Sequence, residues 1–281
     1  MKILYLSCHS VLEFDELRIL TELDEGMPVT EQLNIEVYSM GAYNNPTQSG
    51  DFKRSVIPKG KFYPQLYDIE MQCSKDRIHP ELVAWADVII SMHNSTLPGQ
   101  TAQQPWIVNN WDLFRSMGKK VVWRSIGQST PAIETELRKY RAEGLKIIRY
   151  SPLEEKIHNF AGVDALIRFA KDEDEFSGWK GNRQQVITFA QSFKKRGEHL
   201  GFHVFDKVTD GFYRTVYGME NENLGEMWGG APSYEEIKRN LQEARVFFYF
   251  GTVPAPYTLS LIEAMMTGVP VVAVGEQLRK V

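Results

Sequence analysis

The residues best placed to do chemistry lie between Gly251 and Ala273, where a loop follows an apolar run and leads into a helical pattern. The first turn of a helix has free N–H groups and the positive end of the helix dipole, and both favour an anion such as phosphate. Glu263 lies about one turn into this helix, and a carboxylate accepts hydrogen bonds from two ribose hydroxyls. Because ligands of open α/β sheets bind outside the carboxyl ends of the strands, we expect a nucleotide site here.

A second group of polar residues follows the first apolar run, KILYL: His9, Ser10, Glu13 and Asp15. Carboxylates in this position can bind acceptor hydroxyls or act as general bases. Acids at the start of a helix also stabilise the helix itself, so both interpretations stay open. His93 ends a later apolar run, where it either faces a cleft or packs in the core.

Strand-like runs alternate with helical patterns along the chain, which is typical of parallel α/β sheets. The predicted strands are Lys2–Leu6, Glu36–Met40, Asp87–Met92, Lys120–Arg124, Lys146–Tyr150, Ala165–Ala170, Val186–Ala190, Tyr213–Tyr217, Val246–Phe250 and Val269–Val274. The predicted helices are Val11–Glu25, Pro80–Ala86, Pro131–Gly144, Leu200–Val208, Tyr234–Ala244 and Leu259–Thr267.

A charged and then glycine-rich stretch, Lys171–Asn182, interrupts this alternation and predicts a linker. We therefore expect an α/β protein of two Rossmann-like domains, residues 1–175 and 183–281, with a cleft between them.

The bulk composition excludes several classes of protein. The 281 residues carry a formal net charge of −4, which gives no sign of the basic face that nucleic-acid binding needs. No apolar stretch reaches the ~20 residues of a membrane span. Cys8 and Cys73 form no CxxC pair, which fits a reducing cytosol. We expect a cytoplasmic protein without a nucleic-acid partner or an integral membrane segment; peripheral membrane contact stays open.

The C-terminal motif resembles that of the retaining GT-B glycosyltransferases of family 4, the glycosyl transferases group 1. Their signature is a Glu, seven residues, a second Glu, then Ala-Met and a Gly-x-Pro-Val-Val-Ala strand. Glu263 matches the second Glu, which binds the nucleotide ribose in that family, and Ala264–Ala273 matches the rest. Ala255 stands where the family has the first Glu, which contacts the donor sugar, and Thr258 stands where Gly is common.

The resemblance continues upstream over Phe189–Leu200, where the family has an Arg and a Lys that bind the diphosphate. Arg196 takes the Lys position and Gln191 the Arg position, and Lys194 or Lys195 can compensate for the lost charge. The resemblance implies a nucleotide-sugar site made of Gln191, Lys195, Arg196, Gly218, Thr252, Ala255, Pro256, Tyr257, Thr258, Leu259 and Glu263.

The function implied by the resemblance is transfer of a sugar from a nucleotide-sugar donor, with retention of configuration. His93, Arg196 and Glu263 are the implied catalytic residues, and His9, Ser10, Glu13 and Asp15 are candidates for the acceptor side. The donor would be a UDP- or GDP-sugar, bound as substrate without a cofactor. The acceptor would be a carbohydrate, a lipid or another small molecule.

Other interpretations stay open. Ala255 and Gln191 also suit a catalytically inactive protein that binds a nucleotide or glycan, and the fold also suits a sugar-nucleotide epimerase. The chain ends six residues after Gly275, whereas family members usually continue, so we expect an incomplete second domain. Asp172 and Asp174 resemble the metal-binding pair of GT-A glycosyltransferases, but we interpret them as an acidic linker and expect no metal.

Overall fold

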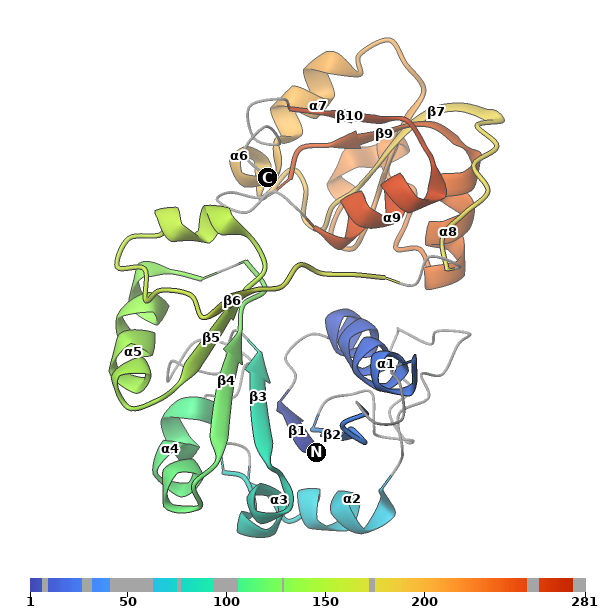
Figure 1. Ribbon diagram of the computed structural model, residues 1–281. Coiled ribbons are helices and arrows are strands. Elements are labelled where there is room, and N and C mark those ends of the chain that lie inside the picture. Colours follow the sequence, from blue (N-terminus) through green and yellow to red (C-terminus); the bar gives the residue numbers. More distant parts are fainter. Residues whose placement is uncertain are drawn as a thin grey trace. The chain divides into compact units, whose positions relative to one another are not determined.

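The computed structural model describes residues 1–6, 10–26, 32–40, 63–74, 77–92, 106–127, 129–171, 175–251 and 258–274. The chain forms two compact units, of which the first ends at Arg168 and the second begins at Phe169. Each unit contains one sheet of parallel strands (Figure 1).

The first unit has six parallel strands in the order β2-β1-β3-β4-β5-β6. Its helices and strands are β1 (Lys2–Leu6), α1 (Ser10–Gly26), β2 (Glu36–Ser39), α2 (Pro64–Glu70), α3 (Pro80–Trp85), β3 (Val88–Met92), α4 (Trp106–Ser116), β4 (Lys120–Arg124), α5 (Pro131–Ala142), β5 (Lys146–Arg149), the 3₁₀ helix η2 (Pro152–Lys156) and β6 (Ala165–Leu166).

Helices cover both faces of this sheet: Figure 1 shows α1 on one side and α4 and α5 on the other. The inner strands β1 and β3 are buried or half-buried on both faces, which is why they read as continuous apolar runs rather than alternating patterns. Apolar side chains from β1, β3, β4 and β5 form one core with those of α2, α3, α4 and α5, including Leu4, Ile89, Trp123, Ile147, Phe114 and Leu137.

The second unit has four parallel strands in the order β10-β9-β7-β8. Its helices and strands are β7 (Arg183–Phe189), α6 (Gly197–Leu200), α7 (Phe202–Val208), β8 (Arg214–Tyr217), the 3₁₀ helix η3 (Glu222–Met227), α8 (Tyr234–Glu243), β9 (Ala244–Tyr249), α9 (Leu259–Thr267) and β10 (Val271–Ala273).

Alternate residues of β9 face two separate cores, because successive side chains of a strand point to opposite faces. Phe247 and Tyr249 pack with Leu241 of α8 and Leu261 of α9. Phe248 packs with Phe205 of α7 in the core of the other face. The helices α8 and α9 therefore lie on one face of the sheet and α7 on the other, as in a doubly wound fold.

Most predicted elements are confirmed within the described residues, and α9 has the bounds that the sequence predicts. The helices α2 and α4 were not predicted, and the predicted strand Ala165–Ala170 extends only over Ala165–Leu166. The predicted helix Leu200–Val208 begins at Phe202, because Gly201, which has a positive φ of 73°, separates α7 from the short helix α6. A side chain at this glycine would collide with the ring of Phe250.

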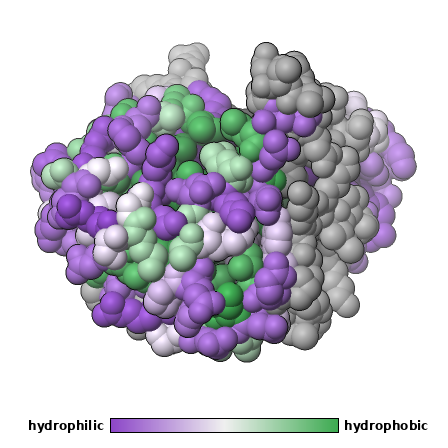
Figure 2. All heavy atoms as spheres, turned by 60° about the horizontal axis from the view of Figure 1, so that its bottom comes forward, coloured by the Kyte–Doolittle hydropathy of each residue, from purple (hydrophilic) through white to green (hydrophobic). Residues whose placement is uncertain are grey.

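The surface and the helices add two observations. On the coloured part of the face shown in Figure 2, hydrophobic residues lie in small groups among hydrophilic ones. None of the helices in the described ranges combines the length and the apolar character that crossing a membrane requires.

Candidate functional site

The strand order of the second unit reverses between β7 and β9. From β7 the chain proceeds to β8 on one side, and from β9 it proceeds to β10 on the other. The connections that leave β7 and β9 therefore separate to opposite faces of the sheet. Open α/β sheets bind ligands in the crevice at such a switch point, outside the carboxyl ends of the strands.

The loop that follows β7 is fixed to the loop that follows β8 by one buried amide. The Asn221 side chain accepts a hydrogen bond from the Phe193 N–H at 2.7 Å and donates to the Ala190 carbonyl at 2.6 Å and the Gly218 carbonyl at 3.2 Å. Asn221 has no solvent exposure. Gly218 has a φ of 135°, and a Cβ there would collide with the carbonyl oxygen of Ala190.

Two non-glycine residues of these loops have left-handed backbone conformations, Ser192 with a φ of 50° and Glu220 with a φ of 59°. The Ser192 hydroxyl donates to the Glu220 carboxylate, and the Ser192 N–H donates to the Met219 carbonyl at 3.0 Å. Such conformations cost of order 1–3 kcal/mol and persist where the surroundings over-determine them, often at ligand sites. The two loops are therefore rigidly connected.

The predicted phosphate-binding residues lie on this rigid loop and face solvent. Gln191, Lys195 and Arg196 are exposed, as is Lys194. Arg196 precedes the short helix α6, and its backbone N–H donates to the Ser192 carbonyl at 2.8 Å. Three consecutive cations next to a switch point provide positive charge where a diphosphate could bind.

On the other side of the switch point, Tyr249 fixes the start of α9. The Tyr249 hydroxyl donates to Thr258 Oγ1 at 2.9 Å and accepts from the Thr258 N–H at 3.1 Å. Thr258 Oγ1 also lies 3.0 Å from Ser260 Oγ. Leu259 is the first residue of the helix. The end of β9 thus sets the position of the helix that carries Glu263.

Glu263 is buried, and its carboxylate is ion-paired. Its side chain is 9% exposed, and Oε1 lies 2.8 Å from Nζ of Lys171, whose side chain has no exposure. Lys171 belongs to the stretch that the sequence predicts as a linker. Thr267 Oγ1 donates to the Glu263 carbonyl at 2.7 Å, one turn further along the helix.

The remaining predicted nucleotide-site residues, Thr252, Ala255, Pro256 and Tyr257, lie outside the described residues. The same holds for the Asp172 and Asp174 pair. Among the residues that the structure describes, no group of three or more His, Cys, Asp or Glu side chains is arranged to hold a metal ion.

The strand order of the first unit also reverses, between β1 and β3, which end side by side with Leu6 paired to Ser91. Of the residues expected there, His9 and His93 lie outside the described ranges, and Ser10 is the first residue of α1.

The two carboxylates expected on the acceptor side are buried in the first unit. Asp15 is 1% exposed and Glu13 is fully buried, with Ser39 Oγ donating to Glu13 Oε1 at 2.6 Å. Through this bond Glu13 connects α1 to the end of β2, so its carboxylate is engaged within the first unit.

Glu16, which the sequence did not single out, is the carboxylate of α1 that spans the first unit's switch point. It accepts a hydrogen bond from the hydroxyl of Tyr5 on β1 and from Nε of Arg124 on β4, the latter at 2.7 Å. Its side chain is 19% exposed. Burial and the charge of Glu16 raise the pKa of Tyr5 well above its usual value, so the phenol remains a donor.

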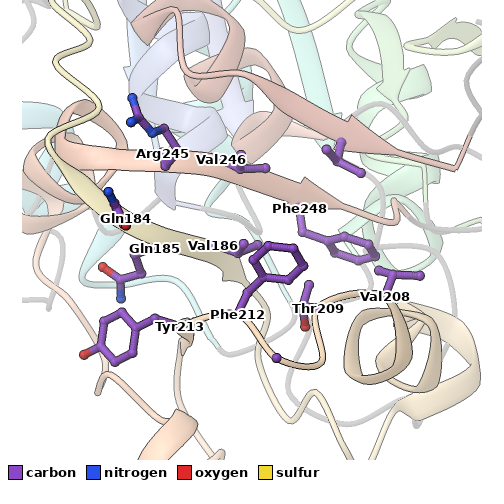
Figure 3. A pocket seen from close by; sticks show the side chains of 12 residues that line it. Gln184, Gln185, Val186, Val208, Thr209, Phe212, Tyr213, Arg245, Val246 and Phe248 are labelled. Carbon is purple, nitrogen blue, oxygen red and sulfur yellow. The ribbon is translucent and has the colours of Figure 1, made fainter.

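A cavity of about 570 Å³ lies at the opposite end of the second sheet. Figure 3 shows the apolar side chains of Val186, Val246, Phe248 and Phe212 around it, with Arg245 on its rim. Gln184 and Gln185, which also line it, lie at the amino-terminal end of β7, and Phe212 lies just before β8. The cavity is therefore remote from the strand ends where ligands of doubly wound sheets bind.

No model of a protein family matches this chain, and no curated protein matches it in sequence. Solved structures do match it. The structure of Anabaena HepE in complex with UDP and glucose is 14% identical, with a TM-score of 0.58 over 97% of this chain and 80% of that chain. The structure of the same protein with UDP-glucose is also 14% identical in sequence, with a TM-score of 0.56 over 97% of this chain and 80% of that chain. At this identity the likeness shows a shared fold, and it confirms the predicted class: two Rossmann-like α/β domains of the GT-B type.

Proposed function

We propose that this chain is a glycosyltransferase that takes its sugar from a nucleotide-sugar donor, and that the second unit binds the nucleotide diphosphate at the switch point between β7 and β9. The observation that carries the proposal is the placement of two separately predicted groups. Gln191–Arg196 follows β7 and the helix bearing Glu263 follows β9, so both flank the place where doubly wound sheets bind ligands. The UDP and UDP-glucose complexes of HepE, which shares the fold, support a uridine nucleotide as the first probe.

In this proposal, Lys195 and Arg196 bind the diphosphate, and Glu263 accepts hydrogen bonds from the ribose. Catalysis then consists of stabilising the negative charge that develops on the departing diphosphate. Cations and backbone amides at the switch point can do this without an obligatory metal. The acceptor, a carbohydrate, lipid or other small molecule, binds at the carboxyl ends of β1 and β3 of the first unit, the ends that His9 and His93 follow in the sequence. Retention of configuration remains the expectation from the resemblance.

The proposal is tested with a panel of nucleoside diphosphates and their sugars, with thermal unfolding as the readout. A nucleotide at ~100 times its Kd stabilises a specific binder by ~2.7 kcal/mol. We expect this for UDP or GDP with the wild-type chain. Arg196→Gln should weaken it, whereas Lys207→Gln, an exposed lysine on α7, should not.

Donor turnover then separates an enzyme from a binding protein. Release of UDP or GDP from the matching sugar nucleotide, in the presence of EDTA, is the expected result. Binding without hydrolysis or transfer from any common sugar nucleotide would favour the inactive binding protein, and no stabilisation by any nucleoside diphosphate would contradict the proposed site itself.

A further inference from the structure

Glu263 has an ion-pair partner that comes from a distant part of the sequence. Nζ of Lys171 lies 2.8 Å from Glu263 Oε1, and the lysine side chain has no exposure to solvent. Lys171 lies in the segment by which the chain enters the second unit, two residues after Phe169. The helix that carries the proposed ribose-binding carboxylate is thus connected to this entry segment, of which residues 169–171 and 175–182 are described.

The ammonium group of Lys171 lies against two aromatic rings. It is 5.4 Å from the ring centroid of Phe176 and 5.7 Å from that of Tyr234, and the two rings meet edge to face at 88° with centroids 5.7 Å apart. A desolvated cation over aromatic faces gains electrostatic attraction from the rings. Lys171 is therefore held by the rings as well as by Glu263, so its charge has a fixed position.

The entry segment is also hydrogen-bonded to both helices of this face. The Trp179 N–H donates to the carbonyl of Thr267 on α9 at 3.1 Å, and Trp179 Nε1 donates to the carbonyl of Ala244 after α8 at 2.8 Å. The Lys180 N–H donates to the carbonyl of Gln242 at 2.7 Å. These bonds fix residues 179 and 180 to α8 and α9, and the ammonium of Lys171 lies between residues of the same two helices, Tyr234 and Glu263.

Stabilising the fold does not by itself explain why an ion pair is buried at this position. Removing two charges from water costs more than their attraction returns in many proteins, and apolar residues of similar size would hold the segment to α9 as well. A carboxylate with two oxygens and about four acceptor positions can take part in an ion pair and still accept hydrogen bonds from hydroxyl groups. A ligand that presents hydroxyls at the switch point explains why a carboxylate stands at position 263.

We propose, on the basis of the nucleotide site proposed above, that Lys171 is a positioning residue of that site. Its ammonium group fixes the orientation and the negative charge of the Glu263 carboxylate, which in turn binds the ribose hydroxyls of the nucleotide. The entry segment is therefore part of the nucleotide site rather than a passive connection.

The test compares the affinity of the full chain for UDP, 2′-deoxy-UDP and inorganic pyrophosphate by calorimetric titration. Lys171→Met should weaken UDP binding roughly tenfold, the loss expected for a hydrogen bond to a charged group. It should also reduce the preference for UDP over 2′-deoxy-UDP, because the misplaced carboxylate no longer distinguishes the ribose. Pyrophosphate lacks a ribose, so its affinity should not change.

Three further variants make the result specific. Lys171→Arg keeps the charge and should restore most of the UDP affinity. Lys238→Met is the matched control, because Lys238 lies over the same rings, 4.8 Å from the centroid of Tyr234, but pairs with Glu235. Lys238→Met should leave the affinities for UDP and 2′-deoxy-UDP unchanged. If Lys171→Met does not fold, Lys171→Gln takes its place, since its amide retains a hydrogen-bond donor.

The outcomes are distinguishable. A Lys171 variant that binds UDP with wild-type affinity and wild-type preference over 2′-deoxy-UDP, while Glu263→Gln weakens binding, overturns this inference and leaves the proposed function intact. A wild-type chain that binds neither UDP nor any other nucleoside diphosphate contradicts the proposed function on which the inference rests.

Discussion

The carboxyl ends of the two sheets use charge differently. In the first unit one cluster of charges is buried and paired within itself. Arg149, at the end of β5, is 1% exposed and makes two hydrogen bonds of 2.7 Å to Glu134 of α5, which has no exposure. The guanidinium is sandwiched between the rings of Trp123 and Phe160, 5.0 Å and 4.6 Å from their centroids. A second carboxylate, Glu154, lies 3.5 Å away.

In the second unit, a neutral amide holds the loops after β7 and β8 together, and the charged side chains of the loop after β7 face solvent. Asn221 connects the ends of β7 and β8, while Lys194, Lys195 and Arg196 of the loop so fixed are exposed. The Arg149 cluster stabilises the fold of the first unit, whereas the exposed cations after β7 are, in the proposed function, the groups that attract the diphosphate. Charge near a strand end therefore does not by itself indicate a ligand site, because burial and pairing decide its role.

The largest effect should come from breaking the ion cluster of the first unit. Arg149→Met leaves Glu134 and Glu154 buried without their cation, and removing one partner of a buried pair costs about 3–5 kcal/mol. We expect the urea midpoint of the first unit's unfolding to fall accordingly.

The matched control for Arg149 is Lys139→Met. Lys139 forms a pair of 2.7 Å with Glu136 but is 62% exposed, and exposed pairs are worth about 0–1 kcal/mol. Equal losses from the two variants would mean that burial does not set the value of these charges. The comparison between the two units would then lose its physical basis.

A smaller effect is expected at the loops of the second unit. Asn221→Ala leaves the Phe193 N–H and the Ala190 carbonyl without their partner, and each unsatisfied buried group costs about 1–3 kcal/mol. Because the loop carrying Arg196 would lose its fixed position, UDP affinity should fall together with the unfolding free energy of this unit. Asn223→Ala, at an exposed neighbour, should change neither. If the variant is destabilised but binds UDP with undiminished affinity, UDP binding does not depend on the fixed position of this loop.

The sequence predicts the elements that have a clear pattern and misses those that depend on distant contacts. The helix α9 follows from its apolar spacing and a glycine just past its end. The helix α4 does not follow, because it contains two asparagines, which are weak helix formers. In the structure Asn110 is buried, accepts from the Ile78 N–H at 2.9 Å and donates to the Trp106 carbonyl at 2.9 Å. A long-range bond therefore stabilises what local propensity does not favour.

The residues of the candidate site likewise divide into those that a local motif predicts and those that depend on distant contacts. Glu263 and Arg196 follow from local motifs, so their positions next to a strand end could be predicted. Lys171 could not be predicted, because it stands in a charged, glycine-rich stretch typical of linkers and its partner is far along the chain. Asn221 lies three residues after Gly218, and nothing in its spacing indicates that its amide connects two loops.

The smallest effect is expected from a carboxylate of the first unit that is only partly buried. Asp164 accepts hydrogen bonds from the Ile147 N–H at 2.9 Å and from Lys146 Nζ at 3.2 Å, with Arg141 3.5 Å away. Burial acts to raise the pKa of Asp164, but these donors and charges outweigh it and lower the pKa. A lowered pKa means stability that is present above the unfolded pKa, near ~3.9, and is lost as the pH falls toward the folded value.

We therefore expect the wild-type chain to lose stability more steeply than Asp164→Asn below about pH 4.5, with urea midpoints measured between pH 6 and pH 3 as the readout. The difference should be small because the Asp164 side chain is 25% exposed, so water screens its pairs. Asp112→Asn removes an exposed carboxylate of α4 and is the matched change in net charge. If the two variants flatten the acid profile equally, net charge rather than pairing governs it. The stability of the first unit in acid would then depend on its net charge and not on the particular ion pairs that distinguish this unit from the second.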